Sequence, residues 1–284
     1  MEKISFIKMS GAGNDFIVID KKLNPLLNLD HKIIRKLCDR RYGIGADGVI
    51  TISDSKIYDF EMEYFNADGS TGSLCGNGAR CAIRFAENSS RLHGNKTNFL
   101  SNSVPYTGEV LLDNLIKFDF NSPGKLKLNF KVKAANQLIN SSYVDTGSPH
   151  VVIKIDDVLK DTNRLDSRYS DLDQFPVFEL GREIRFLKEF SPDGTNVNFM
   201  KIIDGIVHIR TYERGVENET LSCGTGSTAT AIIIHLIDNL QPPITLLTRG
   251  GDRLIVNFNI INQKIENLSL TGPANIIFSG EILT

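Results

Sequence analysis

The sequence predicts an α+β protein built from two pseudo-symmetric lobes, each rich in strands and wrapped around one apolar helix. The first observation is a motif that occurs twice: Cys-Gly-X-Gly opens an alanine-containing apolar run in residues 74–82 and again in residues 222–230. The second is an echo in the same order, because residues 13–19 and 147–153 both begin with a Gly-led polar turn and continue into a β-branched strand. The third is length, since 284 residues suffice for two domains of ordinary size. Together these observations indicate a duplicated architecture.

The composition excludes several classes of protein. With 41% hydrophobic and 23% charged residues, the chain can bury large cores and is not intrinsically disordered. The formal charge of -2 lacks the basic excess that a general nucleic-acid or anionic-membrane partner requires. The longest apolar run, residues 232–237, contains His235 and falls far short of the roughly 20 residues of a membrane-spanning helix.

The first residues and the cysteines indicate a compartment. Residues 1–6 show no basic region followed by an apolar one, so we expect no signal peptide. Four cysteines in a chain of this size predict free thiols in a reducing environment instead of a disulfide scaffold. We therefore expect a soluble cytoplasmic protein.

Short β-branched runs and apolar alternation predict most of the elements. A first helix is expected after the capping residue Asp30, because residues 33, 34, 37 and 38 are apolar and share one helical face, and Gly43 is expected to end it. The polar segment 121–133 is expected to cross between the lobes. The expected strands are 5–9, 16–20, 48–52, 60–66, 115–120, 143–144, 150–155, 196–202, 206–212 and 253–258.

The helices that follow the repeated motif differ from surface helices. Residues 229–240 are apolar nearly all round, and residues 79–86 are similar apart from Arg80 and Arg84, so each helix must be enclosed by its own lobe. Residues 1–121 are expected to form the N-terminal lobe with Cys75, and residues 122–271 the C-terminal lobe with Cys223. Each of these two cysteines is thereby placed at the start of a buried helix.

A cysteine at the start of a helix has a particular chemistry. The unpaired N–H groups and about half a positive charge from the helix dipole favour the thiolate. The same N–H groups, opened up by Gly76, Gly78, Gly224 and Gly226, can hold a carboxylate. Because the site is duplicated, two helix starts related by an approximate two-fold are expected to face one substrate.

Two thiols at one carbon suit the inversion of a centre that bears hydrogen. Inversion requires a base on one face and an acid on the other, and the helix dipoles stabilise the charge that spreads into the carboxylate as the proton leaves. One cysteine would be the thiolate and the other the thiol. The sequence therefore predicts racemisation or epimerisation of an amino acid without a cofactor, with Cys75 and Cys223 as the catalytic residues.

Other interpretations of the same residues are weaker. Cys38 and Cys81 are expected to be core residues. Residues 43–48 match G-x-G-x-x-G, but a helix precedes them and a strand follows, which is the reverse of a dinucleotide site. No cysteine spacing indicates zinc. A Cys–His hydrolase using His150 or His208 would leave the second Cys-Gly-X-Gly unexplained. A non-catalytic amino-acid-binding protein remains an alternative.

The motifs resemble those of the diaminopimelate epimerases over essentially the whole chain. The shared segments are Lys-Met-Ser-Gly-Ala-Gly-Asn-Asp-Phe at 8–16, Tyr-Phe-Asn-Ala-Asp-Gly-Ser at 64–70, Gly-Thr-Asn-Val-Asn-Phe at 194–199, Tyr-Glu-Arg-Gly at 212–215, and both Cys-Gly-X-Gly motifs. Proline racemases and phenazine-biosynthesis isomerases share the fold but resemble the chain less in Gly-Asn-Asp-Phe and Glu-Arg-Gly, and a racemase of the proline type is the nearest alternative.

The resemblance implies a diaminopimelate epimerase-like fold with mixed sheets, in which strands at 272–284 return to the N-terminal lobe. It implies interconversion of LL- and meso-diaminopimelate for lysine and peptidoglycan precursors, without a cofactor and usually in a homodimer. From the composition and the cysteine spacing we expect no metal and no nucleic-acid or membrane partner. Cys75 and Cys223 would be the acid–base thiols. His150 and Glu213 are candidates for tuning their ionisation, and a structural hydrogen bond is the alternative role of His150. The substrate-binding residues would be Asn14, Asn66, Gly76, Asn77, Asn196, Glu213, Arg214, Gly224 and Thr225.

Two positions depart from the family pattern. Ser148 stands where the family commonly has Asn in contact with the far end of the substrate, and Gly48 stands where Gln is often found. The first departure puts one substrate hydrogen bond in question. Neither affects the two thiols.

Overall fold

A computed structural model describes residues 3–72 and 75–283 of the chain. The chain divides into two compact units: residues 1–119 with 271–284 form the N-terminal unit, and residues 120–270 form the C-terminal unit. Leu74, the first residue of the first repeated motif, lies outside the described residues, as do Met1 and Glu2 of the expected leaderless start.

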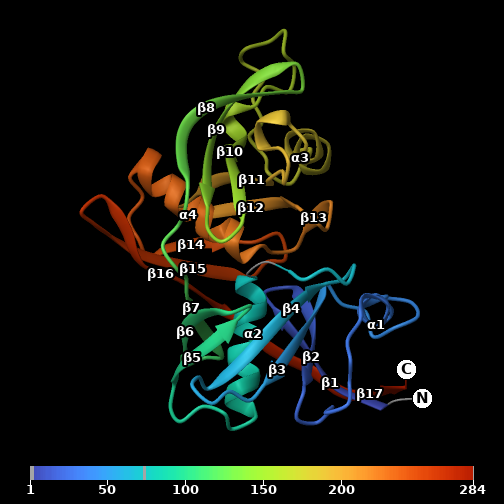
Figure 1. The fold of residues 1–284 in the computed structure, drawn as a ribbon. Coiled ribbons are helices and arrows are strands. Elements are labelled where there is room, and N and C mark those ends of the chain that lie inside the picture. Colours follow the sequence, from blue (N-terminus) through green and yellow to red (C-terminus); the bar gives the residue numbers. More distant parts are fainter. Residues whose placement is uncertain (1–2, 73–74, 284) are drawn as a thin grey trace. The chain divides into compact units, whose positions relative to one another are not determined.

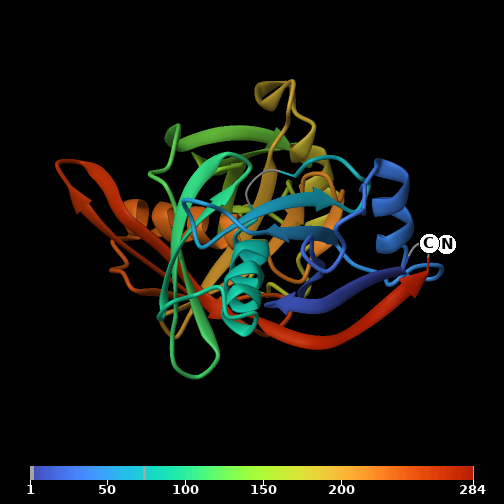
Figure 2. The same cartoon turned by 60° about the horizontal axis from the view of Figure 1, so that its bottom comes forward.

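The N-terminal unit is a mixed sheet with two helices. Its strands pair in the order β17, β1, β2, β3, β4, β5, β6, β7; the pairs β2–β3 and β4–β5 are parallel and the others antiparallel. Because Lys3 pairs with Leu283, the first and last described residues lie side by side (Figure 2). The elements are β1 (Lys3–Gly11), β2 (Asn14–Asp20), α1 (His31–Cys38), β3 (Gly48–Ser53), β4 (Phe60–Asn66), α2 (Gly76–Asn88), β5 (Lys96–Ser101), β6 (Val104–Val110), β7 (Leu115–Asp119) and β17 (Asn275–Leu283).

The C-terminal unit is also a mixed sheet with two α-helices. The pairs β10–β11 and β12–β14 are parallel, whereas β8–β9, β9–β10, β11–β12, β12–β13 and β14–β15 are antiparallel. The elements are β8 (Leu126–Ala134), β9 (Gln137–Asp145), β10 (Pro149–Lys154), η1 (Ile155–Asp157), α3 (Val177–Arg185), η2 (Lys188–Phe190), β11 (Asn196–Ile203), β12 (Ile206–Glu213), β13 (Asn218–Thr220), α4 (Gly224–Asp238), β14 (Ile244–Leu247), β15 (Arg253–Ile261) and β16 (Lys264–Pro273), whose last residues belong to the N-terminal unit.

The two units repeat one arrangement. The order β1, β2, α1, β3, β4, α2, β5, β6 recurs as β9, β10, α3, β11, β12, α4, β14, β15, apart from the short inserted strand β13. The direction of pairing recurs too, because β2–β3 corresponds to β10–β11 and β4–β5 to β12–β14, all parallel. The Gly-led turns before β2 and β10 contain Gly13 and Gly147, both with positive φ, which glycine adopts without strain. The predicted duplication is confirmed.

Each unit encloses one helix. The buried stretch of α4 runs from Gly224 to Ile234, and α4 contacts β9, β10, β11, β12, β14 and β15. In the same way α2 contacts β1, β2, β3, β4, β6 and β7 (Figure 1). A helix that is apolar nearly all round is stable only when most of its surface is buried, so the sheets wrap around both helices. The predicted mixed sheets around central helices are therefore confirmed.

The other two helices each present one apolar face to a sheet. Asp30 caps α1, its carboxylate accepting from the Ile33 N–H at 2.8 Å. The helix ends at Cys38 and not at the expected Gly43, because the backbone of Asp39 is already extended (φ -63°, ψ 123°). Helix α3, which the sequence analysis missed, packs Val177, Leu180 and Ile184 into the core of the C-terminal unit.

The expected crossing segment 121–133 is wrong in its second half. Strand β8 begins at Leu126, so only residues 120–125 connect the last strand of one unit to the first of the other. From Leu126 onward, polar and apolar residues alternate, and the exposed lysines on one face gave the segment its polar composition. Within the described ranges, no helix is both long enough and apolar enough to span a membrane.

Candidate functional site

The first repeated cysteine caps a helix in the N-terminal unit. Cys75 has extended backbone angles at the N-cap of α2, and its Sγ accepts from the Gly78 N–H at 3.3 Å. At most helix starts a Ser, Thr, Asp or Asn oxygen accepts this hydrogen bond, and here the thiol sulfur accepts it. The half-buried sulfur therefore lies at the positive end of the helix, as the sequence predicts.

Asn14 lies beside this sulfur with its amide oriented by Asp47. The Asn14 Nδ2 group donates to the Asp47 carboxylate at 2.6 Å, so its Oδ1 faces the Cys75 Sγ at 3.7 Å. Asp47 is held by Arg40 at 2.7 Å, and Arg40 also binds Asp15 through both nitrogens of its fork. The amide of Asn14 therefore presents an acceptor, and not a donor, to the thiol.

The remaining predicted residues of this unit behave differently from one another. Asn77 is buried in the first turn of α2; its Nδ2 donates to the Asn14 Oδ1 at 3.5 Å and its Oδ1 accepts from Arg80 at 2.8 Å. Gly76 is buried at the first position of the same helix. Asn66 ends β4 and donates to the Ser70 hydroxyl at 3.0 Å instead of to this cluster.

The second repeated cysteine precedes α4 in the C-terminal unit. Cys223 is buried, and its Sγ lies 3.5 Å from the Thr225 hydroxyl. Gly224 and Thr225 form the first turn of the helix and are buried as well. The second glycine of the motif, Gly226, leaves room for a neighbour, because a Cβ there would lie only 2.3 Å from the Asn198 Oδ1.

Behind this helix start lies a buried network around His150. Its Nε2 is 2.9 Å from both the Ser148 and Thr225 hydroxyls, and its Nδ1 is 3.1 Å from the Asn198 Nδ2. Burial, followed by the charge of Arg214, lowers the pKa of His150 to about 3. The imidazole is therefore neutral at physiological pH.

We expect this neutral histidine to make the folded state sensitive to acid. Its pKa is lower in the folded chain than in the unfolded one, so its stability contribution is present above about pH 6.5 and decreases as the pH falls toward 3. Between pH 6.5 and 5 the contribution should decrease by about 2 kcal/mol. Urea unfolding of the wild type and of His150→Gln at pH 7.5 and 5.0 measures it. Equal pH dependence in both proteins would contradict the assignment.

Three further predicted residues gather at the end of β12. Asn196 is buried, donates to the Pro149 carbonyl at 2.9 Å and accepts from the Arg214 N–H at 2.8 Å, which fixes the backbone at Arg214. Glu213 accepts from the Thr220 hydroxyl at 2.9 Å. Arg214 lines a cavity of about 920 Å³ together with Ser148. Among the described residues its guanidinium has one long hydrogen bond, to the Asp193 carbonyl at 3.5 Å, so it is available to an anion.

The remaining cysteines are ordinary core residues. Cys38 and Cys81 are buried, and burial raises the pKa of each thiol to about 12. Their sulfurs are therefore protonated at neutral pH.

Sequence reasoning missed the groups that orient the predicted ones. Asp47 belongs to the G-x-G-x-x-G segment, whose order of helix and strand is the reverse of a dinucleotide site. Asn198 is the second Asn of the 194–199 segment, and its partner Thr211 is a buried residue of β12. A polar residue inside a predicted core strand was the available signal, because such a residue must find a buried partner.

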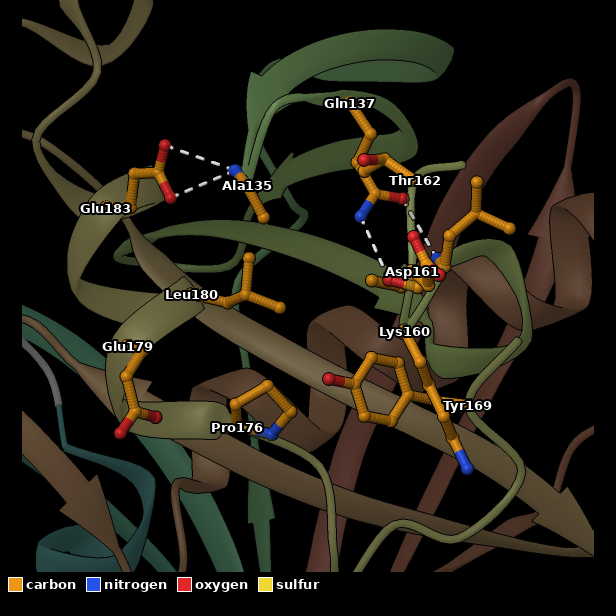
Figure 3. A pocket seen from close by; sticks show the side chains of 12 residues that line it. Ala135, Gln137, Lys160, Asp161, Thr162, Tyr169, Pro176, Glu179, Leu180 and Glu183 are labelled. Carbon is orange, nitrogen blue, oxygen red and sulfur yellow. Dashed lines mark hydrogen bonds between the residues drawn. The ribbon is translucent and has the colours of Figure 1, made fainter. Parts of the chain in front are cut away.

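Another hollow of the C-terminal unit is structural. Its volume is about 390 Å³, and Gln137, Lys160, Tyr169 and Glu183 are among the residues that line it (Figure 3). Gln137 donates to the Leu159 carbonyl and accepts from the Leu159 N–H, and Glu183 accepts from the Ala135 N–H.

Across the described part of the chain, no three His, Cys, Asp or Glu side chains are grouped as a metal site requires.

The architecture is that of a class of duplicated proteins with known structures. A phenazine biosynthesis protein from Bacillus anthracis superposes with a TM-score of 0.72 and 13% identity, covering all of both chains. A hydroxyproline epimerase from Agrobacterium vitis superposes with a TM-score of 0.69 and 14% identity, covering 99% of this chain and 92% of the other. The chain therefore has the fold of the phenazine-biosynthesis and hydroxyproline-epimerase proteins.

Sequence similarity specifies the family within that fold. The family model for diaminopimelate epimerase matches residues 6–102 and 142–277. Diaminopimelate epimerases from Chlorobaculum tepidum and Aquifex aeolicus are 39% and 37% identical to the chain, over 96% and 98% of it and over 99% and 98% of their own lengths. The chain belongs to the diaminopimelate epimerase family and is an isomerase.

Proposed function

We propose that the protein interconverts LL- and meso-2,6-diaminopimelate without a cofactor, using Cys75 and Cys223 as base and acid. The observation that carries this proposal is that each cysteine stands immediately before the first turn of an enclosed helix. Two such helix starts supply two sulfurs and two sets of N–H groups. This duplication matches a reaction that removes a proton from one face of a carbon and returns one to the other.

The chemistry at the α-carbon follows from these groups. One sulfur, as thiolate, takes the α-proton while the other, as thiol, delivers a proton to the opposite face, so the two exchange protonation states with each turnover. The backbone N–H groups at Gly76, Asn77, Gly224 and Thr225 bind the reacting carboxylate. Their dipoles stabilise the negative charge that spreads into it as the proton leaves.

The far end of the substrate carries an ammonium and a carboxylate, and both need partners. Arg214 binds the distal carboxylate with its fork, with its backbone held by Asn196. Asn14, Asn66, Asn196 and Glu213 supply acceptors and donors for the zwitterion. Ser148 replaces the Asn of relatives, but its hydroxyl contacts His150 and Thr225, so we assign it no substrate contact.

Deuterium incorporation tests the reaction directly. Incubation of LL-diaminopimelate in heavy water should convert it to a mixture with the meso form and place deuterium at the inverted α-carbon. Unchanged stereochemistry without incorporation would refute the proposal. Turnover of proline in place of diaminopimelate would indicate the alternative racemase, and binding without exchange would indicate an amino-acid-binding protein.

Arg214→Ala tests the distal contact. We expect kcat/KM for diaminopimelate to fall by about 10- to 100-fold, mainly through KM, because a charge-assisted hydrogen bond contributes about 1.5–3 kcal/mol. Lys127→Ala is the matched control, since Lys127 lines the same cavity but lies over the Phe130 ring. Equal losses in both variants would show that only the positive charge of the cavity matters.

We also propose a cytoplasmic homodimer. Free thiols that act as acid and base require a reducing compartment, and the cytoplasm provides one. The oligomeric state is measured by light scattering of the purified protein, and a monomeric mass with full activity would contradict the dimer.

A further inference from the structure

The two sulfurs meet different hydrogen-bonding groups. We propose that in the resting protein Cys223 is the thiolate and Cys75 the thiol, and that Asn198, Ser148 and Thr225 are positioning residues that direct a hydrogen bond to the Cys223 sulfur. This inference rests on the proposed function only in giving the two sulfurs a catalytic role.

The orientation of Asn198 is fixed first. This fully buried side chain donates from Nδ2 to the Val151 carbonyl at 3.0 Å, and a carbonyl can only accept. Its Oδ1 accepts from the Thr211 hydroxyl at 3.0 Å. The nitrogen that faces the His150 Nδ1 at 3.1 Å is therefore a donor.

The tautomer of His150 follows. Because Nδ1 accepts from Asn198, the single ring proton of the neutral imidazole is on Nε2. The low pKa of this buried ring means that the tautomer does not change to the imidazolium at physiological pH. The Nε2–H group thus donates toward the Ser148 and Thr225 hydroxyls, both at 2.9 Å.

The protons of the Ser148 and Thr225 hydroxyls can then be placed in only one way. Ser148 cannot donate to a nitrogen that carries hydrogen, so within the described contacts its proton goes to the Thr225 Oγ1 at 3.2 Å. Thr225 receives this bond, and its own proton then has the Cys223 Sγ, at 3.5 Å, as its acceptor. A sulfur that accepts a hydrogen bond is favoured as thiolate.

In the N-terminal unit, the side chain that faces the cysteine sulfur presents a hydrogen-bond acceptor instead of a donor. Asn14 uses its Nδ2 on the Asp47 carboxylate, and its Oδ1 faces the Cys75 sulfur. A carbonyl oxygen can accept from a thiol but repels a thiolate. Although the Gly78 N–H also reaches this sulfur, a thiol can accept that bond and donate to Asn14 at once.

Charged groups lie near both hydrogen-bond networks. The charge of Arg214 acts on His150, and Glu213 beside it binds Thr220. In the N-terminal unit, Asp47 and Asp15 share Arg40, and the buried Arg80 binds Asn77 in the first turn of α2. Substitutions at Cys75, Cys223 and Thr225 leave these charged groups unchanged.

The test measures each thiol by itself, without substrate. The ultraviolet absorbance of the thiolate is followed against pH in Cys75→Ala, to report on Cys223, and in Cys223→Ala, to report on Cys75. Burial raises the pKa of the Cys38 and Cys81 thiols to about 12. We expect a lower midpoint for Cys223. Adding Thr225→Val to Cys75→Ala should raise that midpoint by about one pH unit, a roughly tenfold loss of thiolate below it, whereas Thr225→Ser should leave it unchanged.

Several outcomes would overturn the inference. These are a lower midpoint for Cys75, a Thr225→Val midpoint equal to that of Thr225→Ser, or an Nδ1–H tautomer of His150 in the nitrogen NMR spectrum of the wild type. If instead the midpoints and the tautomer agree but no epimerisation occurs, the proposed function fails while this inference stands.

Discussion

Replacing either Cys75 or Cys223 by Ala is expected to reduce epimerisation by at least about 10³-fold, because each variant lacks one of the two proton-transfer groups. The measurement is the conversion of LL- to meso-diaminopimelate. A second readout separates the two halves of the reaction. A protein with one remaining thiol can remove and return the α-proton on the same face, so it should exchange deuterium into one stereoisomer without inverting it.

Cys38→Ala is the matched control for these variants. Cys38 is buried on α1 with its pKa raised to about 12 by burial, so it takes no part in proton transfer. We expect its loss to lower the free energy of unfolding by about 1 kcal/mol and to leave kcat unchanged. Equal activity losses for Cys38→Ala and the two helix-start variants would show that the assay responds to folding alone, which would remove the support for the thiol pair.

The duplicated fold could be predicted because its signals are local. The apolar helices enclosed by each unit, the two Gly-led turns and the repeated Cys-Gly-X-Gly are all visible in short windows of sequence. The strands of β11 and β12 were also predicted nearly to their ends, because their apolar runs are continuous and buried.

Elements with one exposed face were harder to predict. Strand β8 reads as alternating leucine, lysine, asparagine, phenylalanine and valine, but its charges suggested a connection. Strand β17 is exposed along most of its length and is defined by its pairing with β1, whose paired residues lie 265 to 280 positions away in sequence. Helix α3 has Val177, Leu180 and Ile184 at helical spacing, a signal that was present and overlooked.

The residues of the candidate site also differ in how far the sequence predicts them. Residues that supply reactive or polar groups directly, such as Cys75 and Arg214, are identifiable from motifs. The residues that orient them are not, since Asp47 reaches Asn14 across 33 positions and Asn198 reaches His150 across 48. The direction of each hydrogen bond depends on which strands pair in the sheet. Only the folded chain determines that pairing.

The second glycines of the two motifs should differ strongly in their response to substitution by Ala. Replacing Gly by Ala inside a helix normally stabilises it by about 0.5–1 kcal/mol. A Cβ at Gly226 would lie 2.3 Å from the Asn198 Oδ1, which is held by buried hydrogen bonds. We therefore expect Gly226→Ala to lower the free energy of unfolding by about 3 kcal/mol, through overpacking and a displaced buried amide. At Gly78 the nearest atom is the flexible Ile50 Cδ1 at 3.3 Å, so Gly78→Ala should change stability by less than about 1 kcal/mol.

A double-mutant cycle shows whether Asn198 is the cause. Asn198→Ala removes the atom that a Cβ at position 226 would strike, so Gly226→Ala should cost much less on that background, with a coupling energy of about 1–3 kcal/mol by urea unfolding. An unchanged cost would mean that the Cys223 side chain, 3.3 Å from the same Cβ, sets the limit instead. In that case glycine would be required at position 226 by the thiol itself and not by the network that orients His150.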